Sequence, residues 1–427
     1  MSELIKIESS SSDLKTDSSS LTQDDNVDQV ETVHDDKVTD LTEGGDKVPV
    51  KTSSAGRLVV REYGDIKISA MNLNYVFDTY TNFDKPKLIG CFSCQLNEDG
   101  NSETYHGDKS SLRYCCFDRF EDYIDIDLLE SYSRTTLIGR VPVTEIHVLR
   151  WIIDNSESLA ENQETGSIAD FIFHSRVIRS IMATPFIPKD DWTLIAVKVR
   201  GSIILAELDT EQRRNDVKYQ IEDRLKGSYA GYKFLEKLTR YPDGSRASTA
   251  FNGARDSFYT VTRSKVGGHS LLYSNRVDCI VDENQFEKPL EQMKFAQIKT
   301  RGHNWNDNKN TRRRFYQNRI IGWWTEALIS GIDTIICGDK RPNNTVQKVS
   351  QIQANSLLQR SNQWSPSTCV QFLEKTLTFI KEMVTEELTV YKIICDPHTG
   401  IKARKLSDPV DKHIPSWYIN GQSPNDQ

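Results

Sequence analysis

The stretches LLYSNRVDCIV (Leu271–Val281) and KFAQIK (Lys294–Lys299) carry the features that decide the fold. Both are short and rich in apolar, aromatic or β-branched side chains, which predicts two strands. Polar groups stand at alternate positions near the end of each: Arg276 and Asp278 in the first, Gln297 and Lys299 in the second. Because residues i and i+2 of a strand point to the same face, each pair is predicted to share a face.

Outward from these strands, strand-like and helix-like patterns alternate without a regular rhythm. Further strands are expected at Leu58–Ser69, Trp192–Val199, Ser202–Leu208, Ser257–Arg263, Thr334–Cys337 and Val390–Cys395. Helices are expected at Val143–Asn155, Glu211–Arg240 (broken or bent at Gly227), Thr311–Ser330 and Pro366–Glu387. Arg200 and Gly201 form a predicted hairpin turn. This pattern indicates an α+β fold with a mixed β-sheet core flanked by helices.

The first 55 residues differ in composition from the rest. Residues 1–50 have a net charge of −9 and the remaining 377 a net charge of +2. Residues 1–55 are rich in Ser and Asp and contain no aromatic residue, so we predict a disordered acidic tail. No Pro- or Gly-rich linker divides residues 56–427, which predicts one domain there. The near-neutral charge of that domain excludes a globally basic nucleic-acid binder but leaves room for a local basic groove.

The eight cysteines are too sparse for a disulfide framework in 427 residues, so buried reduced thiols are expected. Cys91 and Cys94 have the spacing of half a zinc site, but the chain shows no matching second half, and buried thiols are the favoured interpretation. No apolar run is long enough to span a bilayer, and the start of the chain does not resemble a signal peptide, so we expect no membrane association and a cytoplasmic or nuclear location.

The acid and lysine at the two strand ends have the arrangement of a metal-dependent nuclease site. In such sites, carboxylates from adjacent strands hold Mg²⁺ or Mn²⁺, and a lysine orients water or stabilises developing phosphate charge. Taken alone, Asp278 and Lys299 are equally compatible with a salt bridge at the strand ends, and that simpler interpretation is favoured without further context.

A basic and aromatic segment follows the second strand. It contains Lys299 and Arg301, then RRRFY (Arg312–Tyr316) and Arg319. Such a segment can neutralise phosphates and stack on bases. Three arginines at a helix N-terminus oppose the helix dipole, a cost that a polyanion would relieve. The alternative is a solvated helix start, and we favour RNA or DNA contact.

Taken together, these segments resemble the DXO family of RNA decapping nucleases and exoribonucleases. The matching stretches occur in the family order over about residues 84–420 and are PKLIGCFS (86–93), LRY (112–114), MATPF (182–186), GYKF (231–234), RVDC (276–279), QIKT (297–300), GWW (322–324), WSPSTC (364–369) and IPSWY (414–418). The resemblance implies a DXO-like scaffold in which active members bind divalent metal, remove defective caps from RNA and then degrade it from 5′ to 3′.

The residues that the resemblance implies for catalysis are mostly replaced. The family arginine falls on Ser175, beside Arg176. The glutamate that ends the GYKFE motif falls on Leu235, with Glu236 displaced by one position. That displacement turns a helical side chain by about 100°.

The same holds on the two strands. Arg276 replaces the first glutamate of the ExD motif, and Gln297 replaces the glutamate of the ExK motif. Glu326 stands where the family has a glutamine, so only Asp278 and Lys299 remain. One carboxylate cannot hold two divalent cations, and Arg276 adds repulsion of several kcal/mol even at an effective dielectric of about 20. We therefore predict no intact catalytic set, no metal and no cofactor.

Three functional hypotheses follow. The favoured one is an inactive protein that binds RNA 5′ ends or nascent transcripts and protects them from processing, with phosphate contacts from Arg276, Lys299, Arg301, Arg312, Arg313, Arg314 and Arg319. A chain of this kind resembles the insect Cutoff branch of the family. That resemblance implies a nuclear location, action on germline piRNA-precursor transcripts and chromatin-associated protein partners. The second is an active Mg²⁺- or Mn²⁺-dependent decapping exoribonuclease that uses Asp278, Glu236 and Glu326. The third is a scaffold that binds only proteins.

Overall fold

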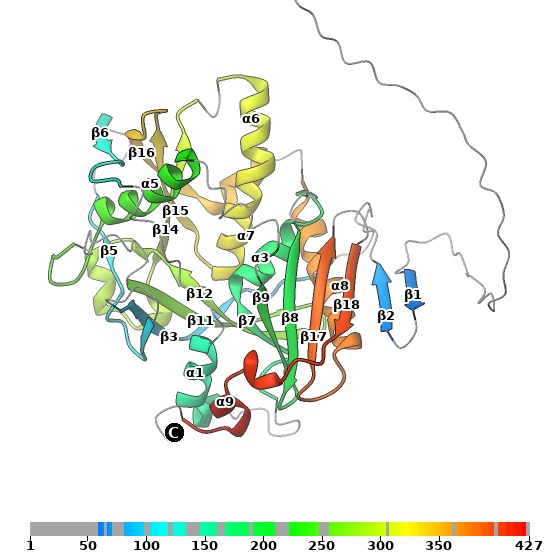
Figure 1. The fold of residues 1–427 in the computed structure, drawn as a ribbon. Coiled ribbons are helices and arrows are strands. Elements are labelled where there is room, and N and C mark those ends of the chain that lie inside the picture. The colour runs from blue at the N-terminus through cyan, green and yellow to red at the C-terminus, as the bar shows by residue number, and fades with distance from the viewer. Residues whose placement is uncertain are drawn as a thin grey trace, which may run out of the picture. The chain divides into compact units, whose positions relative to one another are not determined.

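The chain forms two large mixed sheets (Figure 1), and it passes from one to the other within Leu271–Val281. The computed structural model describes residues 59–63, 66–70, 81–97, 103–117, 123–133, 146–159, 167–187, 191–208, 210, 222–246, 256–304, 307–360, 364–396 and 400–423. These residues belong to one compact unit, Ser53–Gln427. The predicted tail over residues 1–55 lies outside the described residues and stays a prediction.

The first large sheet has nine strands in the order β18-β17-β8-β9-β7-β12-β11-β3-β4. In chain order these are β3 (Lys87–Leu96), β4 (Glu103–His106), β7 (Phe171–His174), β8 (Trp192–Val199), β9 (Ser202–Leu208), β11 (Asp256–Val266), β12 (His269–Val277), β17 (Val390–Asp396) and β18 (Gly400–Lys405). Only β7 pairs in parallel, with β9 and β12, and the other pairs are antiparallel. The predicted strands Trp192–Val199 and Ser202–Leu208 are confirmed, as is their turn, in which Arg200 and Gly201 both have positive φ (53° and 77°).

The second large sheet has seven strands in the order β10-β5-β13-β14-β15-β16-β6. They are β5 (Tyr114–Cys115), β6 (Tyr123–Asp127), β10 (Thr239–Arg240), β13 (Cys279–Ile280), β14 (Phe295–Gly302), β15 (Thr334–Lys340) and β16 (Thr345–Gln353). A two-stranded ribbon, β1 (Val59–Tyr63) and β2 (Ile66–Ala70), precedes both sheets in the chain. The expectation of mixed sheets with flanking helices is thus confirmed, but the strands are divided between sheets.

The predicted strand Leu271–Val281 is interrupted, and this interruption positions the site. β12 ends at Val277 in the nine-stranded sheet, and β13 begins at Cys279 in the seven-stranded sheet. Asp278 lies between them, where the chain passes from one sheet to the other. The prediction of one continuous strand is wrong because each half pairs with different neighbours.

The helices are α1 (Ile146–Asp154), α2 (Ser156–Leu159), α3 (Ser175–Ala183), α5 (Glu222–Leu238), α6 (Lys309–Phe315), α7 (Ile321–Ser330), α8 (Pro366–Met383) and α9 (Ser416–Asn420), with a π-helical turn over Tyr316–Ile320. Short 3₁₀ turns lie at Glu283–Glu287, Leu290–Gln292, Ala354–Arg360 and Val410–Lys412. The helix predicted over Thr311–Ser330 begins two residues earlier and contains the π turn. The predicted break at Gly227 is wrong, since α5 continues through it. Residues 211–221 of that prediction lie outside the described residues.

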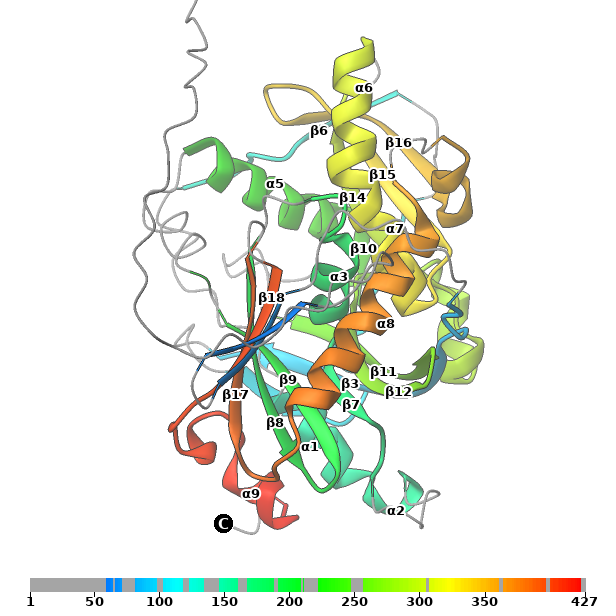
Figure 2. The ribbon, with the colours of Figure 1, turned by 90° about the vertical axis from the view of Figure 1, so that its right-hand side faces the viewer.

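Both faces of the nine-stranded sheet are covered. Phe171 and Phe173 of β7 pack into the cluster formed with α3, α7 and α8, while Ile172 packs on the other side with α1 and α9. Figure 2 shows α8 beside α3 on the face of the sheet that carries Phe171 and Phe173. On the seven-stranded sheet, Phe234 of α5 packs with Ile298 and Ile336. No helix among the described residues combines the length and apolarity needed to cross a bilayer.

Candidate nucleic-acid site

A cavity of about 350 Å³ opens where the two sheets meet. Its walls come from the junction of β7 and α3, from α5, from β11 and β12, from the crossover residue Asp278, from β14 and from α7. The charged and polar lining residues are His174, Ser175, Arg176, Arg179, Ser228, Tyr232, Tyr259, Asn275, Arg276, Asp278, Lys299, Glu326 and Ser330. Arg276, Asp278, Lys299 and Glu326, which the sequence singled out, therefore share one cavity.

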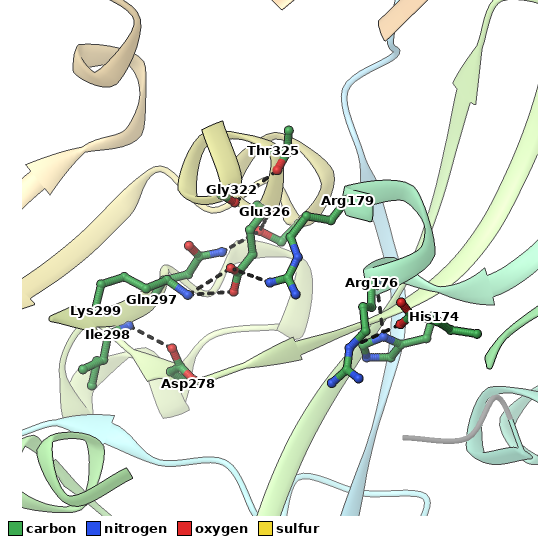
Figure 3. A network of polar contacts seen from close by, with 12 residues as sticks. His174, Arg176, Arg179, Asp278, Gln297, Ile298, Lys299, Gly322, Thr325 and Glu326 are labelled. Carbon is green, nitrogen blue, oxygen red and sulfur yellow. Dashed lines mark hydrogen bonds and ion pairs between the residues drawn. The ribbon is translucent and has the colours of Figure 1, made fainter. Parts of the chain in front are cut away.

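Asp278 is held by the backbone of the neighbouring strand. Its Oδ2 accepts a hydrogen bond of 2.8 Å from the backbone N–H of Ile298 (Figure 3). Arg276, also in the cavity wall, places its guanidinium carbon 5.9 Å from the ring centroid of Tyr232 on α5. Burial lowers the pKa of Arg276, but Tyr232 and Asp278 outweigh it and raise the pKa above its usual value. Arg276 therefore stays charged beside the one retained acid.

Glu326 of α7 is already paired with two cations. Nζ of Lys299 lies 2.9 Å from each carboxylate oxygen, and Nη1 of Arg179 lies 3.4 Å from Oε2 (Figure 3). Burial raises the pKa of Glu326, but Lys299 and then Arg179 outweigh it and bring the pKa below its usual value. The carboxylate is thus ionised, and its negative charge is balanced by Lys299 and Arg179.

Gln297 does not line the cavity, although it lies on the same strand as Lys299. Its side chain is buried, and its Nε2 donates to Oγ of Ser330 at 3.4 Å. Its Oε1 has no hydrogen-bond partner among the described residues. An amide here provides a neutral group in place of the glutamate that the family resemblance implies.

The N-terminus of α3 adds a second group of donors, which sequence reasoning largely missed. His174 is the N-cap, and its Nδ1 accepts from the backbone N–H of Arg176 at 3.2 Å. Burial lowers the pKa of His174 to about 3, and Arg176 and Arg179 add to the shift. The ring is therefore neutral with its proton on Nε2, and this buried N–H has no partner among the described residues.

Ser175, the expected position of the family arginine, is the first residue of α3 and lines the cavity. Arg176 and Arg179, on the same helix, line it as well and bring the charge that Ser175 lacks. Nε of Arg176 lies 3.8 Å from a carboxylate oxygen of Glu207. Arg179 could not be selected from the sequence, because only the packing of α3 against α7 brings it to Glu326.

On α5, the side chains of Leu235 and Glu236 point in the directions that the one-residue displacement predicts. Leu235 is 5% exposed and borders both the cavity and the core beneath α5. Glu236 does not line the cavity, and its Oε2 lies 3.3 Å from Nζ of Lys233. The displaced glutamate is therefore turned away from Asp278 and Glu326.

The predicted basic segment is divided. Arg301 forms a bidentate pair with Asp339 of the neighbouring strand β15. Arg312, Arg313, Arg314 and Arg319 are exposed and do not line the cavity.

The three arginines lie close to the start of a helix, as expected. Asn308 caps α6, accepting from the backbone N–H groups of Asn310 and Thr311, and the arginines lie in the last turn of α6 before the π turn. Because α6, the π turn and α7 form one continuous helix, the arginines are its fourth to sixth residues, near the positive end of its dipole, and their side chains are exposed.

The cavity residues do not fit a divalent cation of the Mg²⁺ or Mn²⁺ type. Such ions require several oxygen ligands, and the acids here are Asp278 and the already neutralised Glu326. Arg276 and Lys299 lie beside them and repel a cation. Within the described ranges, no three potential ligands converge in the cavity, and Asp278, Glu236 and Glu326 do not form a group.

An acid and a lysine at neighbouring strand ends, on mixed sheets with flanking helices, are the arrangement expected of a nuclease scaffold. The chain belongs to the family of RAI1-like PD-(D/E)XK nucleases, which it matches over residues 84–419. Gln297 stands two residues before Lys299, the spacing of the (D/E)XK part of that pattern.

Related proteins and structures agree with this assignment. The chain is 25% identical over 360 residues to the decapping and exoribonuclease protein of Xenopus laevis (78% of this chain, 85% of the relative) and 23% identical over 352 residues to that of Homo sapiens (80% and 86%). The fold matches Candida albicans Rai1 in complex with pU5 and Mn²⁺ with a TM-score of 0.65 at 17% identity (83% of this chain, 98% of the other). It matches Scheffersomyces stipitis Rai1 in complex with (3′-NADP)⁺ and calcium equally well, at 13% identity (83% and 99%).

Proposed function

We propose that this chain is an inactive member of its family that holds RNA 5′ ends in the cavity and shields them from processing. One observation carries the proposal: the carboxylate of Glu326 is neutralised by Lys299 and Arg179, and Arg276 stands beside Asp278. The cavity therefore offers an excess of cations to a phosphate and too few oxygen ligands to a metal.

The donors of the cavity define how a phosphate is bound. Arg176, Arg179 and Arg276 provide guanidinium groups, which suit bidentate contact with phosphate oxygens. Nε2–H of His174 provides a neutral donor whose burial without a partner costs about 1–3 kcal/mol until an acceptor arrives. The Candida relative binds pU5, which supports a phosphorylated oligonucleotide as the ligand.

The same residues account for the absence of hydrolysis in this proposal. In an active member, the bound metal would activate water and stabilise the developing charge. Here Lys299 is engaged by Glu326 instead of by an attacking water, and Arg276 fills the position of an acid. RNA would be held by charge and released intact.

The test is a nuclease assay paired with filter binding on the purified full chain, using 5′-monophosphate RNA and Mn²⁺. The human relative serves as the positive control. We expect salt-dependent binding without degradation. Degradation that Asp278→Ala abolishes would establish the active enzyme instead, and absence of binding at low salt would favour a scaffold that binds only proteins.

We also propose a nuclear location, action on nascent germline transcripts of the piRNA-precursor type, and chromatin-associated protein partners. The support is the resemblance to the Cutoff branch, which combines the same scaffold with lost catalytic residues. Crosslinking and sequencing of RNA bound to the tagged chain in germline nuclei tests this. Recovery only from cytoplasmic fractions would contradict it.

A further inference from the structure

Cys94, Glu103 and His147 converge at a place remote in sequence from the RNA cavity. Cys94 is on β3, Glu103 on β4 and His147 in the first turn of α1. One potential ligand atom from each lies within 4.8 Å of those of the other two. Nε2 of His147 is already 2.8 Å from Oε2 of Glu103. None of the three lines the cavity described above.

We propose that Cys94, Glu103 and His147 bind a zinc ion that ties the β3–β4 hairpin to α1. A thiolate, an imidazole and a carboxylate are the side-chain ligands that zinc takes, and three protein ligands leave a fourth position for water. The sulfur and nitrogen donors favour zinc over Mg²⁺ or Mn²⁺. The site is therefore chemically distinct from the divalent-metal chemistry of active relatives.

The surroundings favour an ion over a catalytic thiol. Cys94 is 1% exposed, so no substrate reaches its sulfur, whereas the side chains of His147 and Glu103 are 16% and 15% exposed and leave a path for an ion. The ring of His147 stacks on Tyr105, with centroids 6.2 Å apart, which fixes its orientation. The nearby cation Arg150 is paired with Asp154, which offsets its repulsion of a bound ion.

The structure agrees with the interpretation that Cys91 and Cys94 are thiols packed in the interior and not half of a zinc site. Cys91 and Cys94 are three residues apart on one strand, so they point to opposite faces. Cys91 packs with the cluster around Phe258, and Cys94 with the cluster around Ile172. The Cys-x-x-Cys pair is therefore not a ligand pair, and Cys94 instead meets Glu103 across the hairpin and His147 from the helix.

The test measures metal content in the full chain purified without chelator or metal-affinity tag. Mass spectrometry of the metals should find about one zinc per chain. After chelator treatment and reloading with Co²⁺, a thiolate-to-cobalt charge-transfer band should appear, and Cys94→Ser should lose both signals. Cys91→Ser is the matched control and should keep both.

Two results would overturn the proposal: a folded wild-type chain with neither zinc nor a cobalt band, or loss of both signals in Cys91→Ser with retention in Cys94→Ser. If Cys94→Ser does not fold, the zinc content and the cobalt band are measured on the wild type and on Glu103→Gln instead. The wild type should then show both signals, and Glu103→Gln should show weaker ones. RNA binding in the cavity is independent of these outcomes, so this proposal and the proposed function fail separately.

Discussion

At the scale of single residues, His174 gives the cavity wall a buried, neutral hydrogen-bond donor. Its Nδ1 accepts from the backbone N–H of Arg176, so its Nε2 carries the proton, and no residue that the structure describes accepts from it. Nothing in the sequence around His174 marks this role, because it depends on the ring being buried at the start of α3. From the sequence, a histidine close to several arginines would be expected to be exposed to solvent and able to take up a proton.

We predict that His174→Asn weakens binding of 5′-phosphorylated RNA by about 10- to 100-fold, the value of a hydrogen bond to a charged group. Asn keeps the N-cap acceptor for Arg176 but removes the distal donor. His174→Gln, which keeps a distal N–H, should bind more tightly than His174→Asn. Filter binding measures both, and equal affinity for wild type and His174→Asn would contradict the assignment.

The same histidine predicts a pH dependence of folding. Its pKa is about 3 in the folded chain against 6.5 as an ordinary value, so the unfolded chain binds an extra proton between these limits. Stability therefore falls as pH drops through this window, by up to about 1.4 kcal/mol per pH unit. Urea unfolding at about pH 7 and about pH 5 should show a smaller loss for His174→Asn than for wild type. An identical loss would show that His174 does not titrate in this way.

At the scale of elements, α5 shows how tertiary packing overrides a local signal. Gly227 predicts a bend because glycine costs about 1 kcal/mol in a helix interior. Yet the helix is continuous, because Ala230, Phe234 and Leu238 lie along one stripe and pack on the seven-stranded sheet.

Gly227→Ala should therefore stabilise the chain by about 0.5–1 kcal/mol. A Cβ at this position meets nothing within 4 Å. Gly338→Ala is the contrasting variant, because its Cβ would lie 2.5 Å from Cζ of Phe234, and it should destabilise by about 1–3 kcal/mol. Denaturant unfolding measures both. Destabilisation by Gly227→Ala would mean that a bend is required there after all.

α6 carries the exposed arginines outside the cavity. If they contact the RNA that leaves the cavity, reversing Arg312, Arg313 and Arg314 to Glu should reduce the slope of log K against log salt by about two units. The matched control reverses Lys402, Arg404 and Lys405 on β18, an edge strand of the nine-stranded sheet that does not line the cavity, with the same change in net charge. Equal effects of both triples would indicate nonspecific attraction.

At the scale of the whole molecule, the fold of a nuclease family encloses a cavity that is lined by more cations than acids. The cavity still lies where the two sheets meet, and Asp278 and Lys299 still flank it. The scaffold is held by the apolar clusters on the two sheets, and none of Arg276, Gln297 and Glu326 belongs to them. A few substitutions in the cavity are therefore expected to change metal binding without changing the fold.

The combined variant Leu235→Glu, Arg276→Glu, Gln297→Glu and Glu326→Gln should gain Mn²⁺ binding and lose metal-free RNA affinity. It adds carboxylate oxygens, removes the guanidinium beside Asp278 and frees Lys299. Calorimetric titration with Mn²⁺ should show heat for this variant and none for wild type. Circular dichroism checks that it folds, and comparable Mn²⁺ binding by the wild type would refute the charge argument.

The sequence alone was enough for the fold class, for the strands Trp192–Val199 and Ser202–Leu208, and for singling out Arg276, Asp278, Lys299 and Glu326, which share the cavity. These follow from local periodicity and from residue types at fixed spacing. Only the tertiary structure decided that the chain changes sheets at Asp278, that Arg179 reaches Glu326, and that Cys94 meets His147. Such contacts join elements that are far apart in the chain. The hydrophobic periodicity of one helix or strand shows which of its faces is buried, but not which other element packs against that face.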